Sequence, residues 1–174
     1  EVRLARLGRS TSFPAAFQLV AATNPCPCGW HGSRVKQCQC RPAQIHRYLR
    51  RLSGPLRDRI ELWSVLDREP AEKWWSHSDR ARELELRRRI FAARQRALER
   101  GALNAALDGD ALKEACHLED NARQWLQTWA DRMNLSLRAL AGTMRVARTV
   151  ADFHERSRVM QEDLAEALAF RPPV

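Results

Sequence analysis

Two short apolar runs stand out in the first part of the chain. The first, FQLVAATN from Phe17 to Asn24, is almost continuously apolar and lies between two prolines, a pattern typical of a buried strand in a parallel sheet. The second, IELWSVL from Ile60 to Leu66, predicts another strand. Between them, Pro42 suits the first turn of a helix, and apolar residues recur at helical spacing as far as Leu52.

The second part of the chain shows only helical periodicity. Gly101 is expected to end a long helix in the left-handed conformation, and Ser136 is expected to cap the start of another. In that second helix an apolar stripe runs from Leu137 to Ala151. The predicted helices cover residues 79–100, 109–115, 119–133, 136–153 and 161–170.

These patterns predict an α/β fragment followed by an all-α part, predominantly helical. Two strands and one helix do not complete a parallel sheet, because such a sheet needs further strands and helices on both faces. We therefore expect the remaining strands to lie before Glu1. The change of composition near Ser76–Ser78 predicts two domains, residues 1–76 and 77–174.

The net charge of +9, supplied mainly by arginine, favours a polyanionic partner, either a nucleotide or a nucleic acid. The alternative is that arginines such as Arg87–Arg89 only solvate helix faces. No apolar run is long enough to span a membrane, and no secretory signal opens the chain. We expect a soluble, cytoplasmic protein with no membrane partner.

Four cysteines form two Cys-x-Cys pairs within a loop rich in glycine, proline and polar residues: Cys26, Cys28, Cys38 and Cys40. Four thiolates suit the closed tetrahedral shell of a structural Zn²⁺, which leaves no open position for a catalytic water. Zinc ribbons usually have two residues between paired cysteines, so reduced thiols or two disulfides remain alternatives. Within the loop, Trp30, Arg34 and Lys36 could contact DNA. Cys116, by contrast, is expected to be a small buried side chain.

Three separated segments together resemble one family. FPAAFQLVAATNPCPCG, QIHRYLRRLSGPLRDRIEL and SLRALAGTMRVARTVADF with EDLAEALAFR are similar to the C-terminal part of magnesium-chelatase-like AAA+ ATPases of the ComM and YifB branch. The resemblance implies a ring, usually a hexamer, that uses ATP and Mg²⁺. Members of the ComM group resemble DNA helicases that drive branch migration in natural transformation.

The resemblance also implies roles for particular residues. Asn24 matches sensor 1, which orients the attacking water, and Arg59 matches the arginine finger inserted into a neighbouring subunit. Arg138 matches sensor 2 on the helical lid, and Arg138 and Arg145 are expected to face the nucleotide together with Asn24. Arg57 and Glu61 depart from the family pattern, which usually has leucine and aspartate there, so Arg57 is an alternative finger.

Each of these residues also has a purely structural interpretation. Asn24 before a proline can simply end a strand, Arg59 can pair with Asp58 or Glu61, and Arg145 and Arg148 can form a solvated helix edge. The 174 residues contain neither a G-x-x-x-x-G-K-[ST] loop nor an apolar strand that ends in acidic residues.

We therefore expect this chain alone neither to bind ATP tightly nor to hydrolyse it. Two alternatives to a motor fragment remain. One is a stand-alone zinc-loop module that binds nucleic acid, and the other is a subunit of a magnesium chelatase.

Overall fold

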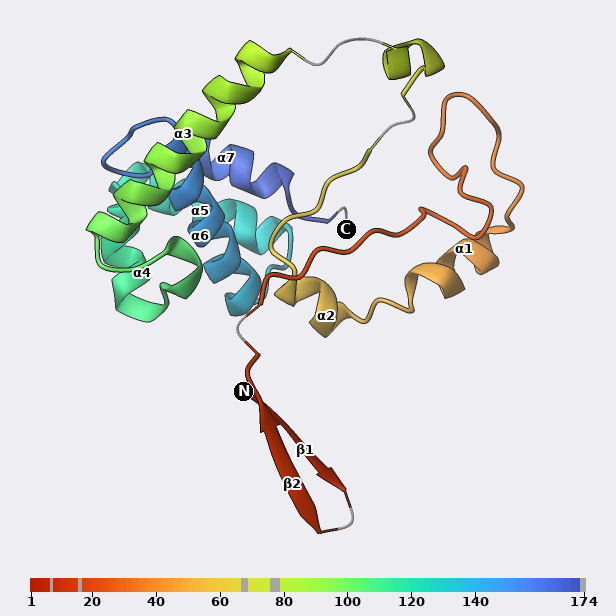
Figure 1. Cartoon of the computed structure of the whole chain (residues 1–174), viewed down its shortest axis with the longest axis horizontal. Coiled ribbons are helices and arrows are strands. Elements are labelled where there is room, and N and C mark those ends of the chain that lie inside the picture. Colours follow the sequence, from red (N-terminus) through yellow and green to blue (C-terminus); the bar gives the residue numbers. More distant parts are fainter. Residues whose placement is uncertain (7, 16, 67–68, 76–78, 173–174) are drawn as a thin grey trace. The chain divides into compact units, whose positions relative to one another are not determined.

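The computed structural model describes residues 1–6, 8–15, 17–66, 69–75 and 79–172 (Figure 1). Within these residues the chain forms seven α-helices, two short 3-10 helices and one two-stranded sheet. It divides into two compact units, residues 1–51 and 52–174. The predicted fold class, a short α/β part followed by a larger helical part, is confirmed. The expected domain boundary at Ser76–Ser78 falls outside the described residues.

The first unit opens with a hairpin that the sequence analysis did not predict. Strands β1 (Val2–Arg6) and β2 (Arg9–Phe13) pair antiparallel, and Val2 lies opposite Phe13. Gly8 sits between them with a φ of 73°, which glycine adopts at little cost. Helix α1 (Pro42–Leu49) begins at the predicted proline and ends before the predicted Leu52.

The two predicted parallel strands are wrong. Residues 17–24 and 60–66 have no strand assignment, and in the first segment Phe17 is 74% and Val20 84% exposed. A strand of a parallel sheet exists only when neighbours accept its hydrogen bonds. Among the described residues only β1 and β2 pair in a sheet, so both apolar segments stay irregular.

The helices of the second unit agree closely with the periodicity of the sequence. Asp79 caps α3 by accepting a hydrogen bond from the Arg82 amide, and Ser136 caps α6 by accepting one from the Ala139 amide. Gly101, with a φ of 101°, follows the end of α3 as predicted. The periodicity of the sequence did not predict the short helix α2. The bounds are α2 Gly54–Arg59, η1 Ala71–Trp75, α3 Arg80–Glu99, η2 Asn104–Ala106, α4 Gly109–Cys116, α5 Asp120–Arg132, α6 Leu137–Phe153 and α7 Gln161–Ala169.

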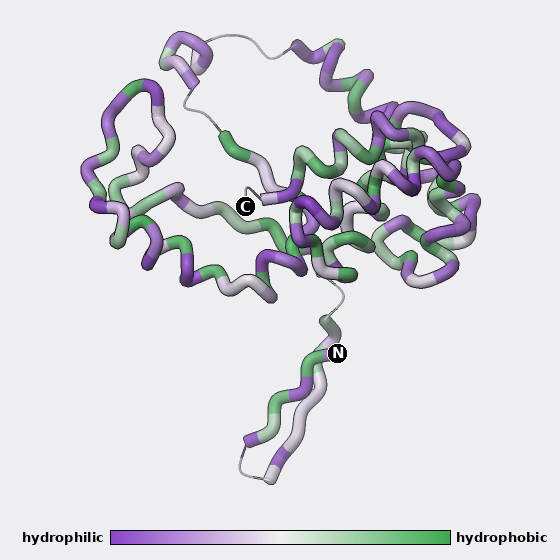
Figure 2. Tube along the Cα trace, turned by 180° about the vertical axis from the view of Figure 1, so that it is seen from behind, coloured by the Kyte–Doolittle hydropathy of each residue, from purple (hydrophilic) through white to green (hydrophobic). Residues whose placement is uncertain are grey.

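The core of the second unit lies where α4, α5 and α7 pack around α6. Figure 2 shows polar and apolar positions mixed along these helices, as expected when each helix buries one side. Ala147, Ala151 and Leu164 are fully buried there. Cys116 is also buried in this core, which confirms its predicted role, and burial raises the pKa of its thiol to about 11. Leu137, at the start of the predicted stripe, is 85% exposed instead.

Two fully buried charged side chains, Arg148 and Asp152, lie within this unit and bind one another. Arg148 is fully buried, which corrects the interpretation that it lies on a solvated edge of α6. It donates to the Asp152 carboxylate at 3.0 Å and to the backbone carbonyls of Ala115, Ser157 and Arg156. Asp152, also fully buried, accepts further hydrogen bonds from Arg100 and Asn104. These bonds join η2, α3, α4 and α6.

Candidate functional site

The four cysteines of the loop gather at one point. The Sγ atoms of Cys26 and Cys28 are 3.3 Å apart, and Cys38 Sγ lies 3.7 Å and 3.6 Å from them. All four Sγ atoms, including that of Cys40, lie within 4.8 Å of one another. Tetrahedral Zn²⁺ with Zn–S bonds of about 2.3 Å places its sulfurs about 3.8 Å apart. The donor set therefore fits a structural zinc.

The same distances exclude the disulfide alternative for this structure. An S–S bond is about 2.05 Å long, much shorter than any separation between these sulfurs. All four cysteines are free thiols in this structure. Of the three alternatives for the loop, which were structural zinc, reduced thiols without metal and two disulfides, the structure therefore does not show the disulfides. Cys26 is fully buried and the other three are half-buried, which shields the cluster from solvent.

The backbone of the loop turns tightly around the sulfurs. The Gly29 amide donates to the Cys26 carbonyl at 3.0 Å, and Gly29 has a φ of 80°. The Ser33 amide donates to the Trp30 carbonyl at 3.1 Å, with Gly32 at the third position of this turn and a φ of 79°. Glycine is the residue that a type II turn requires there. Two left-handed glycines thus fold residues 26–33 back onto the cluster.

Backbone amides point at the sulfurs, although only one residue separates each pair of cysteines. The His31 amide donates to Cys26 Sγ at 3.3 Å, and the Cys40 amide donates to Cys38 Sγ at 3.4 Å. Hydrogen bonds from the Trp30 and Gln39 amides lower the pKa of the Cys28 thiol to about 6. This direction favours the thiolate form of Cys28, which binds zinc, whereas burial raises the pKa of the Cys40 thiol to about 12. Backbone amides therefore reach the sulfurs in spite of the Cys-x-Cys spacing, from residues beyond the first pair and from residues within the second.

One hydrogen bond between side chains closes the base of the loop. Thr23 Oγ1 and Tyr48 Oη are 3.2 Å apart, which ties the residue before Asn24 to helix α1. Asn24 is exposed and lies directly before the loop. Thr23 and Tyr48 are not predictable from the sequence pattern, because no local signal indicates a contact between residues 25 positions apart.

In the second unit, helix α2 is held by several polar contacts that we call the α2 clamp. Asp58 accepts a hydrogen bond from the Ser136 hydroxyl at 2.7 Å, and Glu61 accepts one from Arg145 Nε at 2.8 Å. Arg171 donates to the Ile60 carbonyl at 3.3 Å. The clamp consists of Asp58, Ile60 and Glu61 on one side and Ser136, Arg145 and Arg171 on the other.

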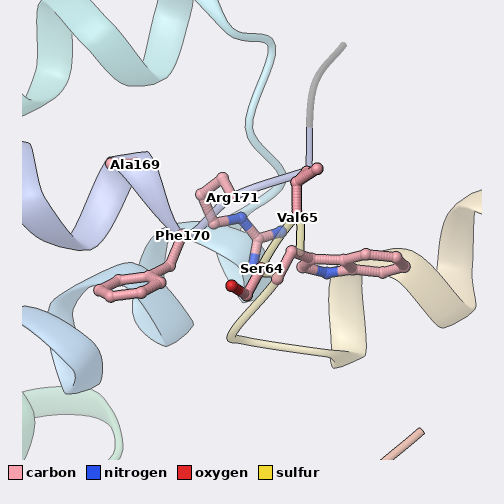
Figure 3. A pocket seen from close by; sticks show the side chains of 6 residues that line it. Ser64, Val65, Ala169, Phe170 and Arg171 are labelled. Carbon is pink, nitrogen blue, oxygen red and sulfur yellow. The ribbon is translucent and has the colours of Figure 1, made fainter. Parts of the chain in front are cut away.

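The segment after α2 is fixed to the end of α7. The Trp63 amide donates to the Phe170 carbonyl at 2.8 Å, and its indole N–H donates to the Ile60 carbonyl at 3.0 Å. Figure 3 shows Ser64 and Val65 beside Arg171 at a shallow hollow, and the hollow is also lined by Trp63, Ala169 and Phe170. Residues 60–65 are therefore attached to the helical unit by their backbone and not by a sheet.

Gly142 of α6 makes room for this attachment. A Cβ atom added to Gly142 would lie 3.1 Å from Glu61 Cγ and 3.4 Å from its Oε1. The first distance is shorter than ordinary van der Waals contact and the second is at its lower limit, so the bare glycine backbone forms the surface against which Glu61 lies. Nothing in the sequence pattern distinguishes this glycine from one tolerated in a helix.

The clamp brings the regions of Arg59 and Arg138 together. Arg59 is exposed, next to Asp58, and its Nη1 donates to the Pro55 carbonyl at 2.9 Å. Arg138 is exposed in the first turn of α6, two residues after Ser136, which holds Asp58. Neither Asp58 nor Glu61 is paired with Arg59 in this structure, since both contact the helical unit. Arg57, the alternative finger, is half-buried.

Arg145 is 17% exposed at its side chain and is bound on two sides. Besides the Glu61 carboxylate, it donates to the Leu107 carbonyl at 3.1 Å. It therefore does not lie on a solvated helix edge. Its expected contact with the nucleotide stays a prediction, as do the roles of Asn24, Arg59 and Arg138.

No helix among the described residues combines the length and the apolar character needed to cross a membrane.

Two segments of the sequence match known protein families. Residues 1–74 match "Magnesium chelatase, subunit ChlI", and residues 81–171 match "Magnesium chelatase, subunit ChlI C-terminal".

Curated relatives extend this similarity over nearly the whole chain. The chain is 35% identical to competence protein ComM of Haemophilus influenzae over 100% of its length. It is 34% identical to the uncharacterized protein YifB of Escherichia coli and 33% identical to that of Salmonella typhimurium, each over 98% of its length. The chain spans 34% of the length of each of these relatives.

Proposed function

Since this chain belongs to the magnesium chelatase family, we propose that it contributes the sensor and finger residues to the nucleotide site of a ring-forming AAA+ ATPase that works on DNA. The chain spans about a third of its curated relatives. In this proposal the phosphate-binding loop and the ligands of Mg²⁺ come from a part of the protein outside these 174 residues. ATP and Mg²⁺ are its cofactors, and other copies of the protein, forming a hexamer, are its partners.

The observation that supports this proposal best is the way the structure presents Arg59. A finger that stabilises charge in a neighbouring subunit must be exposed, and its backbone must be held in place. Arg59 is exposed at the end of α2, and its neighbours Asp58 and Ile60 are bound by Ser136 and Arg171. The α2 clamp thus fixes the backbone on both sides of Arg59, whose exposed side chain would exchange its bond to the Pro55 carbonyl for a contact across an interface.

The exposure of Arg138 supports its assignment to sensor 2. It is exposed on the helix whose cap, Ser136, holds Asp58, so a movement of the lid would shift Arg138 and the α2 helix together. We assign Asn24 to sensor 1 and Arg145 to nucleotide binding on the resemblance. In this structure Arg145 binds the Glu61 carboxylate and so helps to position the segment that follows α2.

A structural zinc completes the proposal for the first unit. Bound zinc would hold Cys26, Cys28, Cys38 and Cys40 in one place and stiffen the loop between Asn24 and α1. Because four sulfur ligands fill the tetrahedral shell, the metal would supply rigidity and no catalytic water. We expect one zinc per chain.

DNA as the substrate is supported by two facts of different kinds. One relative is named a competence protein, and the chain carries a net charge of +9. A strongly basic protein attracts polyanions and raises their local concentration. We therefore propose a DNA motor similar to ComM that acts as a branch-migration helicase in natural transformation and operates in the cytoplasm.

A test of complementation between two variants of the complete protein addresses this function. Arg59→Ala removes the finger, and Arg138→Ala removes sensor 2, so each variant alone should lose ATPase activity. The loss for the finger is expected to be about 10³–10⁵-fold. Because Arg59 serves the neighbouring site and Arg138 its own, a mixture of the two variants contains intact interfaces and should regain activity.

Arg57→Ala is the matched control, since Arg57 lies in the same helix and is half-buried. It should keep most of the ATPase activity. If the mixed variants stay as inactive as each one alone, while both form rings with wild-type subunits, then Arg59 does not act across an interface. ATPase activity that DNA fails to stimulate would contradict the motor part of the proposal.

A second candidate is a stand-alone module that binds nucleic acid. It is favoured by one observation, namely that all four thiols of the zinc site gather without residues from elsewhere in the chain. Such a module would bind DNA in a salt-dependent way, and ATP would have no effect on its affinity. A change of DNA affinity on addition of ATP to the complete protein distinguishes the motor from the module.

A further inference from the structure

The charge of this chain is concentrated in its first unit. Residues 1–51 contain nine lysines and arginines and one acidic residue, Glu1. Residues 52–174 contain 21 basic and 20 acidic residues. Eight of the nine net positive charges therefore belong to fewer than a third of the residues.

A bound metal would not cancel this excess. Four thiolates around one Zn²⁺ carry a formal charge of about −2, which leaves the first unit with about +6. In the second unit, by contrast, arginines pair with carboxylates, as Arg148 does with Asp152 and Arg145 with Glu61. Residues 25–51 contain no aspartate or glutamate, so no carboxylate in that segment neutralises its cations.

Six cations of this segment are exposed, and we call them the basic loop–helix surface. Arg34 and Lys36 lie in the cysteine loop, and the others lie at the start and end of α1. All six side chains reach solvent while the cysteine cluster and α1 hold the backbone beneath them. The members are Arg34, Lys36, Arg41, Arg47, Arg50 and Arg51.

Aromatic rings lie among these cations. Lys36 Nζ is 5.1 Å from the centre of the Trp30 ring, and the Arg51 guanidinium is 5.8 Å from the centre of the Tyr48 ring. Such pairs hold a cation over an aromatic face, and here the cations are exposed while the rings are half-buried. Grooves that bind single strands of nucleic acid combine exposed cations with aromatic rings in this way.

We propose that the basic loop–helix surface binds the phosphate backbone of DNA. This inference rests on the proposed DNA motor and names the surface through which the protein contacts its substrate. Arginine forks bind phosphate in a bidentate manner, and Lys36 adds a point charge. The zinc-bound loop would present Arg34 and Lys36 with little loss of conformational entropy on binding.

A nucleic acid fits this surface better than a lipid membrane does. A membrane-binding element inserts a cluster of apolar and aromatic side chains below its charges. Here the Trp30 ring is half-buried, and Lys36 Nζ lies over it. The exposed large apolar side chains of residues 25–51 are Val35 and Leu49, against six exposed cations, so charge dominates this surface.

The test uses the full 174-residue chain, loaded with zinc, and a fluorescein-labelled 40-nucleotide single strand. Anisotropy titrations between 50 and 200 mM NaCl give the slope of log K against log salt. The variant Arg34→Gln with Lys36→Gln removes two phosphate contacts, so the slope should become shallower by about 1.4. The affinity at 50 mM NaCl should fall several-fold or more.

The matched control is Arg88→Gln with Arg94→Gln, which removes the same charge from two exposed arginines of α3. Its slope should equal that of the unchanged chain. Zinc content, measured for each variant, shows that the cysteine cluster is intact, so a weakened slope is not caused by an unfolded loop.

Three results would overturn the inference. The first is an equal loss of affinity in the two double variants, which would mean that only net charge matters. The second is unchanged binding by the Arg34→Gln, Lys36→Gln variant, and the third is binding to vesicles of phosphatidylglycerol with no binding to DNA. The motor proposal is tested separately by DNA-stimulated ATPase activity of the complete protein, so either proposal can fail alone.

Discussion

Replacement of Asp152 by asparagine should severely destabilise the helical unit. Asp152 is fully buried and accepts hydrogen bonds from Arg148, Arg100 and Asn104. Asparagine keeps the shape of the side chain but removes its charge, which leaves the fully buried Arg148 guanidinium without a counter-ion. Removal of one partner of a buried ion pair costs about 3–5 kcal/mol.

The size of the helical unit determines how far this loss of unfolding free energy lowers the Tm. Residues 52–174 form one compact unit, and at about 2.1 cal/mol/K of unfolding entropy per residue, 1 kcal/mol shifts its Tm by about 4 °C. Asp152→Asn should therefore lower the Tm by at least about 12 °C, as measured by circular dichroism at the helix signal. The matched control is Asp110→Asn, because Asp110 pairs with Lys113 on the surface and should leave the Tm nearly unchanged.

A second variant separates the effect of charge from that of packing. Arg148→Met with Asp152→Leu removes both buried charges and keeps much of the volume, and such replacements are often neutral. This double variant should be more stable than Asp152→Asn alone. If instead Asp152→Asn unfolds at the same temperature as Asp110→Asn, then the buried charges do not stabilise the unit and the reasoning fails.

Three further predictions concern the metal, the clamp and the buried thiol. Cys28→Ser should lower the zinc content, measured by a colorimetric chelator, from one per chain to well below one, whereas Cys116→Ser should keep it. Glu61→Ala should lower the stability of the helical unit by about 1–2 kcal/mol in urea titrations, because Arg145 loses its charged partner, and an unchanged midpoint would contradict the clamp. Because burial raises the pKa of Cys116 to about 11, the folded state keeps that proton between pH 9 and 11 while the unfolded state loses it. Stability should therefore fall over this range in the wild-type chain by up to ~3 kcal/mol more than in Cys116→Ala, and parallel pH profiles would refute the shift.

Local signals in the sequence predicted the helices well. The Ser136 cap, the stop at Gly101 and the start of α1 at Pro42 each depend on residues within one turn, and all three are present in the structure. The four cysteines likewise lie within 15 residues of one another, so the sequence alone was sufficient to place them in one cluster.

Long-range contacts were not predictable from the same signals. Residues 17–24 have the composition of a buried strand, but composition does not provide the neighbouring strands that a sheet needs. Arg148 resembles a solvated arginine on the edge of α6, and only the positions of Asp152 and three carbonyls explain its burial. The contact between Glu61 and Gly142 joins residues that no periodicity connects.

The hydrogen bond from Arg171 to the Ile60 carbonyl joins residues 111 positions apart. During translation, α2 is therefore made well before the residue that completes its docking. Helix α2 leaves the ribosome long before its last partner exists. At about 5–20 residues per second, the interval is on the order of 6–22 s. The helices after residue 79 have mostly local contacts and can form during that time, but α2 docks fully only when the chain has reached Arg171. A newly made chain therefore has the backbone beside Arg59 fixed only after nearly all of these 174 residues have been translated.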